Sequence, residues 1–277
     1  MFTKQKAMIK IRCYIALLLV VLIVFGFLAY GTGGRFNAMS PENQLLEPSL
    51  NHLFGTDVFG RDVFLRTVRG FMNAFLLAIL SWIIAFGFGI PLGIFFAYVG
   101  GLADAIFYHV CNFIFSFPTM VLAIYLASAS DAKIPILIFL TSFALIFSNA
   151  KIVRALVKSL IKENYMIQLQ IMGAGFWHMT RYHLLRESIL NLLPIMPLMI
   201  GHIILGISSF SFLGFGIQPP EAEIGLLLSE NFKLITIAPW TCLLPGLFQF
   251  LIIWALSYLG EMTRKYYTKE GVSHDEF

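Results

Sequence analysis

Six long stretches without a charged residue constrain this chain more than any other feature of its sequence. They cover residues 13–34, 70–103, 105–130, 134–150, 188–220 and 234–260. A helix that crosses a bilayer needs about 20 apolar residues, so each stretch can hold one crossing. The chain is 58% hydrophobic and 12% charged, whereas soluble domains carry roughly 25% charged residues. The sequence therefore predicts an all-α, polytopic membrane bundle of six transmembrane helices.

The distribution of lysine and arginine predicts how these helices are oriented. With six crossings, the N-terminus, the turn at 100–105, the loop at 151–187 and the C-terminal tail share one side of the membrane. That side carries 13 basic residues and the other carries six. Because basic residues are enriched in cytoplasmic loops, we expect a cell-membrane protein with both termini in the cytoplasm. The first apolar stretch is too long for a removable signal peptide and is expected to remain.

The charge boundaries also predict how the chain is divided. The expected parts are a cytoplasmic N-terminus (1–12), a first transmembrane helix (13–34), an external segment (35–69), a transmembrane core (70–260) and a cytoplasmic tail (261–277). The core includes the cytoplasmic loop at 151–187. Since the apolar stretch at 134–150 is short, its helix is expected to take further turns from residues 151–158.

The end of the external segment, HLFGTDVFGRD over residues 52–62, holds capping residues at short spacing. Thr56 or Asp57 can cap a turn, and Asp62 suits the start of the helix that follows. Together with Arg61, they are expected to brace the outer entrance to the second span and to form an external face. Ordinary capping would explain the same residue types without any further function.

Polar residues and helix breaks inside the apolar stretches are candidates for a passage through the membrane. Such groups are tolerated at membrane depth where protein or water satisfies them. The candidates for the translocation path are Phe117, Pro118, Ser208, Ser209 and Ser211. His109 and His202 also lie in apolar stretches, where packing and contact with a substrate both remain open.

The stretch from Lys151 to Glu187 carries six of the 19 lysines and arginines between two apolar stretches. Asn164 can cap a first helix over 165–172, the sequence Gly-Ala-Gly at 173–175 breaks it, and a second helix starts at Phe176. A short helix of this kind can dock into a soluble partner, although a plain connector has the same pattern. The candidate docking residues are Tyr165, Gln168, Leu169, Gly173, Ala174 and Phe176.

Several kinds of chemistry are missing from the sequence. It has no Walker A motif and no Gly-x-Ser-x-Gly or His-Glu-x-x-His pattern. The apolar stretches contain neither Asp nor Glu, so histidine alone is expected to supply ionisable groups there. The three cysteines have no spacing typical of a zinc site or a disulfide framework. We expect no enzyme activity, no cofactor, no metal site and no nucleic-acid partner, and an external source of energy for any transport.

Motifs in order along residues 50–265 resemble the permease subunits of ABC importers of the dipeptide, oligopeptide and nickel class. They are HLFGTDVFGRD at 52–62, IPLGIFFAYVGG at 90–101, SFP at 116–118, SFLGFGIQPP at 211–220, APW at 238–240 and LGEMTR at 259–264. The resemblance implies a type I permease fold with a cytoplasmic coupling helix. It also implies a second permease, two ATP-binding subunits and an extracytoplasmic substrate-binding protein as partners. Peptides, nickel and metal chelates are the implied substrates.

The 151–187 loop departs from the pattern of this family. The usual Glu-Ala-Ala is replaced by Ile167-Gln168-Leu169, and the usual Pro-Asn is replaced by Arg186-Glu187, while the glycine follows at Gly173 as expected. Bulkier side chains in the coupling helix change how it can contact an ATPase. The alternative is a degenerate, non-transporting membrane scaffold or sensor with the same fold. An ATPase that co-purifies with the chain would favour the permease.

Overall fold

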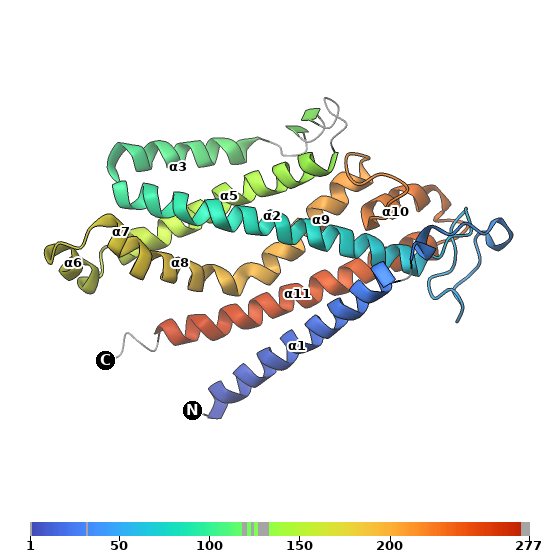
Figure 1. Ribbon diagram of the computed structural model, residues 1–277, viewed down its shortest axis with the longest axis horizontal. Coiled ribbons are helices and arrows are strands. Elements are labelled where there is room, and N and C mark those ends of the chain that lie inside the picture. Colours follow the sequence, from blue (N-terminus) through green and yellow to red (C-terminus); the bar gives the residue numbers. More distant parts are fainter. Residues whose placement is uncertain (1, 32, 118–120, 123–124, 127–132, 273–277) are drawn as a thin grey trace.

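Every regular element is a helix in the part of the chain that the computed structural model describes, residues 2–31, 33–117, 121–122, 125–126 and 133–272 (Figure 1). The longer helices are α1 (Phe2–Gly31), α2 (Val63–Val99), α3 (Gly101–Ser116), α5 (Lys133–Leu160), α9 (Met196–Phe212) and α11 (Trp240–Val272). They run lengthwise along the molecule, and shorter helices lie at its two ends.

Among the described residues, five segments are long and apolar enough to cross a membrane. They are Tyr14–Gly31, Val63–Val99, Ile134–Leu160, Phe176–Phe212 and Trp240–Tyr266. These segments confirm the predicted all-α, polytopic membrane fold. The remaining predicted span, over 105–130, begins within α3, but parts of it (118–120, 123–124 and 127–130) lie outside the described residues. The number of six spans therefore stays a prediction.

The segment Phe176–Phe212 is built from several helical pieces. It contains α7 (Phe176–Met179), a π-helical turn η3 (Thr180–Leu184), α8 (Leu185–Leu192), a 3-10 turn η4 (Leu193–Ile195) and α9. Pro194 and Pro197 stand where η4 passes into α9. Because proline has no N–H to donate, it interrupts the regular α-helical hydrogen bonding at this point.

The α2–α5 pair forms the central contact of the bundle, and small residues allow it. A Cβ atom added to Gly93 of α2 would lie 2.6 Å from the carbonyl oxygen of Ala150 on α5. No side chain fits in that space, so only glycine permits this approach of the two backbones. Elsewhere in the bundle, a hydrophobic core that includes Phe71, Ile204 and Leu256 joins α2 to α9 and α11.

Two short helices mark the opposite ends of the bundle (Figure 1). Helix α6 (Asn164–Ile171) lies at the end of the bundle where α1 begins and α11 ends, and we call this the α6 end. Helix α10 (Ile224–Asn231), followed by the 3-10 turn η5 (Phe232–Leu234), lies at the other end. The segment before α2, with its 3-10 turns η1 (Arg35–Asn37) and η2 (Pro41–Asn43), is also there, and we call this the α10 end.

The long helices extend beyond the apolar stretches and include charged residues. Helix α5 continues past Ala150 and includes Lys151 and Arg154, and α2 includes Arg66. The expected extension of α5 into residues 151–158 is confirmed, since this helix ends at Leu160. Helix boundaries follow backbone hydrogen bonding and caps, whereas the apolar stretches were defined by the first charged residue.

Candidate functional sites at the two ends of the bundle

At the α10 end, Asp57 organises the turn that leads into α2. One carboxylate oxygen, Oδ1, accepts the backbone N–H groups of Phe59 (2.9 Å) and Arg61 (3.0 Å). The other oxygen, Oδ2, accepts Nε of Arg61 at 2.7 Å, and both side chains are buried. Buried charges are stable only when they are paired and hydrogen-bonded. Asp57 therefore fixes both the turn and the direction of Arg61.

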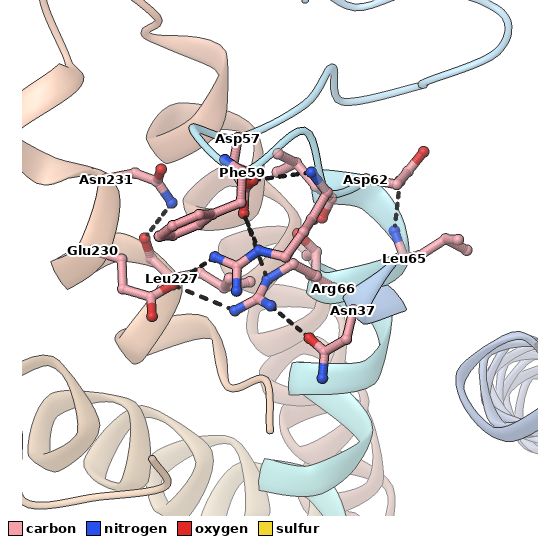
Figure 2. Close-up of polar contacts among 12 residues, drawn as sticks. Asn37, Asp57, Phe59, Asp62, Leu65, Arg66, Leu227, Glu230 and Asn231 are labelled. Carbon is pink, nitrogen blue, oxygen red and sulfur yellow. Dashed lines mark hydrogen bonds and ion pairs between the residues drawn. The ribbon is translucent and has the colours of Figure 1, made fainter. Parts of the chain in front are cut away.

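Two arginines then reach from this segment to α10, as Figure 2 shows. Arg66 has a side chain that is 0% exposed, and it contacts Glu230 Oε2 at 3.3 Å and Asn37 Oδ1 at 2.7 Å. Nη2 of Arg61 lies 3.5 Å from the same Glu230 oxygen. The Glu230 carboxylate on α10 thus binds two arginines at the start of α2 that come more than 160 positions earlier in the chain.

Thr56 and Asp62 complete the four residues predicted for this face. The Thr56 hydroxyl donates to the Asn43 carbonyl at 2.5 Å and accepts the Leu46 N–H at 2.8 Å. Asp62 is the N-cap of α2, since it accepts the Leu65 N–H at 2.9 Å, and it also contacts Nδ1 of His52 at 2.8 Å. All four predicted residues therefore lie together at the start of α2, where each forms at least one of these contacts.

A buried carboxylate that the sequence analysis missed joins α10 to α9. Glu223, the N-cap of α10, accepts the Ser208 hydroxyl at 2.5 Å and the Leu226 N–H at 3.2 Å. Gln249 of α11 donates to the same Ser208 hydroxyl at 2.9 Å. Burial raises the pKa of the Glu223 carboxyl above its ordinary value, and the hydrogen bond from Ser208 acts in the opposite direction. The Ser208 hydroxyl of α9 thus links Glu223 at the start of α10 to Gln249 of α11.

At the α6 end, the chain turns sharply after α6. Gly173 has a φ of +85°, and its N–H donates to the Gln170 carbonyl, while the Ala174 N–H donates to the Leu169 carbonyl. This pair of hydrogen bonds is the Schellman motif, which usually needs glycine at its left-handed residue. The predicted helix–glycine–helix arrangement is thus present. Asn164 is the first helical residue and not the cap as predicted, because Glu163 occupies the N-cap position.

One face of α6 is anchored in the bundle and the rest is exposed. Met166 is buried, and Phe176 packs on Tyr98 with ring centroids 4.8 Å apart. Of the predicted docking residues, Tyr165, Gln168 and Gly173 are exposed, and Leu169, Ala174 and Phe176 are half-buried. Three apolar side chains beside them are about four-fifths exposed, namely Ile171 (80%), Met172 (81%) and Trp177 (80%). Exposed apolar groups of this size suit contact with another protein or with the membrane.

The residues predicted for the translocation path fall into different environments. Ser208 and Ser211 are buried in the bundle, and Ser209 is half-buried and donates to the Leu205 carbonyl. Phe117 is exposed at the end of α3, and Pro118 lies outside the described residues. Ser208 donates to the buried Glu223 carboxylate and holds it in place, and the translocation path itself stays a prediction.

A second charged cluster, at the cytoplasmic side by the predicted orientation, also escaped the sequence analysis. Asp104 of α3 is buried and accepts hydrogen bonds from Arg154 (Nη2 to Oδ2, 2.8 Å) and Lys158 of α5. The sequence contained a usable signal, because the three cations on α5 recur at intervals of three and four residues and thus share one helix face. What the sequence could not supply was the partner helix.

Known proteins resemble this chain over most of its length. Residues 89–267 match the family model described as "Binding-protein-dependent transport system inner membrane component". The glutathione transport system permease protein GsiD of Pectobacterium atrosepticum is 31% identical over 217 residues, which cover 78% of this chain and 72% of that protein. The dipeptide transport system permease protein DppC of Alkalihalophilus pseudofirmus is 29% identical over 233 residues, which cover 84% and 77% respectively. A probable D,D-dipeptide transport system permease protein of Escherichia coli, DdpC, is 31% identical over 210 residues, or 76% and 70%.

Proposed function

This chain belongs to the family of binding-protein-dependent transport system inner membrane components, as an ABC importer permease, and we propose that it forms one half of an ATP-driven passage for short peptides. The other half is a second, related permease. Two ATP-binding subunits supply the energy at the α6 end, and a substrate-binding protein delivers the peptide at the α10 end. In this proposal, the α6 end and both termini face the cytoplasm.

One observation carries the proposed mode of action, namely the exposed apolar tip around α6. Helix α6 is anchored through Met166 and the following α7 through Phe176, so a force on the exposed face of α6 reaches α2 through the Phe176–Tyr98 contact. The chain itself has no nucleotide-binding motif. Energy must therefore enter from another subunit, and Ile171, Met172 and Trp177 offer that subunit an apolar contact.

The peptide assignment is supported by the relatives, whose names describe dipeptide and glutathione transport. They favour peptides over the nickel and metal chelates that the family resemblance also allows. The α10 end suits the delivery step, because its buried ion pairs hold the segment before α2 against α10 in one arrangement. A surface held rigidly needs little reorganisation when a partner docks.

Reconstituted transport tests this function directly. The chain is purified with the subunits that accompany it and placed in lipid vesicles, and ATP-dependent accumulation of the dipeptide alanylphenylalanine and of glutathione is measured. We expect accumulation of at least one probe, dependent on ATP and on the binding protein. A purified complex without an ATPase, or one that accumulates neither probe, would contradict the proposal and favour a non-transporting scaffold.

A further inference from the structure

Lys151 is an unusual charge because it belongs to α5, within a segment that is long and apolar enough to cross a membrane. Its Nζ donates to Asn112 Oδ1 of α3 at 2.8 Å and lies 5.2 Å from the centre of the Tyr108 ring. The two other cations on this face, Arg154 and Lys158, share the carboxylate of Asp104. Among the residues that the structure describes, no carboxylate lies within 4.0 Å of Lys151. Within the described part of the chain, the contacts given for its ammonium group are this amide oxygen and aromatic rings.

An aromatic cavity adjoins this lysine between α3 and α5. The cavity has a volume of about 290 Å³, and its lining includes Phe113, Phe115 and Phe143. The Phe115 ring lines the cavity and also lies 5.8 Å from Nζ of Lys151. Along α5, Phe143 and Lys151 are eight residues apart and therefore lie on the same face, two turns from each other. A cation and an apolar cavity thus stand next to each other on one side of the helix.

Ionisable residues in membrane-crossing helices are costly, and they almost always face the interior of a bundle or a water-filled path. The aromatic rings around Lys151 stabilise its charge only in part, and two of its three N–H donors have no hydrogen-bond acceptor among the described residues. An anionic group that enters the space between α3 and α5 would complete this hydrogen bonding. The adjoining cavity would receive an apolar group attached to that anion.

We propose that Lys151 binds the C-terminal carboxylate of a peptide during its passage, and that the aromatic cavity receives the side chain of that residue. This inference rests on the proposed function, since it assumes a peptide substrate. Lys151 is then a specificity residue for the free acid end of the peptide. The same cation could also hold the phosphate of an anionic lipid, and the experiment below separates the two sources.

Uptake into vesicles gives the first test, with alanylphenylalanine and glutathione as probes and two vesicle compositions, neutral phosphatidylcholine with and without phosphatidylglycerol. Lys151→Met is expected to lower the maximal rate about tenfold in both compositions, because a hydrogen bond to a charged group is lost. Lys151→Arg should retain most of the rate. The control Lys158→Met makes the same change on the same helix but leaves Arg154 on Asp104, and it should stay within about twofold of the unmodified complex.

Zero-length cross-linking gives the second test and shows contact. With peptide trapped in the complex, a carbodiimide activates the peptide carboxyl, and the Lys151 amine displaces the resulting urea to form an amide bond. Mass spectrometry should find the labelled peptide on Lys151 and not on Lys158. The inference is overturned if Lys151→Met transports normally, if its defect occurs only with phosphatidylglycerol, or if trapped peptide never labels Lys151. Failure of the proposed function is a different result, in which the unmodified complex accumulates neither probe.

Discussion

The two ends of the bundle hold their charges and apolar groups in opposite ways. At the α10 end, charged side chains are buried and hydrogen-bonded within the chain: Asp57 contacts Arg61 four residues later, and Arg66 and Glu223 contact residues of other helices. At the α6 end, apolar side chains such as Ile171 and Trp177 extend away from the bundle. The α10 end is therefore stabilised by contacts within the chain, whereas the α6 end offers contacts that another molecule must complete.

This difference assigns the two ends different mechanical properties. Regions with many buried contacts open only with most of the fold, whereas regions with few such contacts open locally at a low cost in free energy. We expect the α10 end to behave as a fixed frame and the α6 segment to order further when its partner binds. Substitutions at the two ends should thus separate stability from transport.

The largest effect on stability is expected from Arg66→Met. The change leaves Glu230 with Arg61 alone and removes the contact with Asn37, and breaking a buried ion pair costs about 3–5 kcal/mol. Thermal unfolding of the purified protein should show a large decrease in stability and a low yield. Arg69→Met is the matched control, one helical turn later, because its partner Glu221 is 46% exposed, so solvent screens the pair and it is worth about 1 kcal/mol or less. Equal losses of stability in Arg66→Met and Arg69→Met would contradict the view that the α10 end is a fixed frame.

The second prediction separates transport from stability at the α6 end. Gly173→Val places a branched side chain at a φ of +85°, which costs about 1–2 kcal/mol and tilts α6, so uptake should be abolished while the spans still insert. Gly175→Val is the control, because Gly175 has an ordinary φ of −77° and open space around it. If Gly173→Val takes up substrate as well as Gly175→Val does, with the ATPase bound and active, the α6 segment is a plain connector and not a docking element.

The smallest effect is expected in the pH dependence of stability. Because burial raises the pKa of Glu223 above 4.5, the folded protein holds this proton more tightly than the unfolded chain. Its contribution to stability is therefore complete below pH 4.5 and is lost as the pH rises through the raised pKa. Glu223→Gln should remove this slope from a series of thermal unfolding curves. Glu221→Gln, at a half-exposed carboxylate, should keep it, and an unchanged slope in Glu223→Gln would refute the assignment.

Local chemistry was readable from the sequence, and contacts between distant segments were not. Asp62 lies at the start of α2 and the chain turns at Gly173 as expected, because both depend on a few neighbouring residues. The pairing of Arg66 with Glu230 joins positions 164 residues apart, and no local pattern indicates it. The extension of α5 through Lys151 was expected, because the apolar stretch before it is short for a crossing, but its contact with Asn112 of α3 was not. The membrane fold was clear because it follows from composition and the length of the apolar stretches.

Photo-cross-linking tests the role of the α6 end most directly. The photoreactive amino acid p-benzoylphenylalanine replaces the exposed Gln168 of α6 or, as a control, Leu50, which is 97% exposed at the α10 end. In the active complex, position 168 should cross-link to the ATP-binding subunit, and position 50 should not. An active complex in which position 168 never cross-links to that subunit would contradict docking through α6.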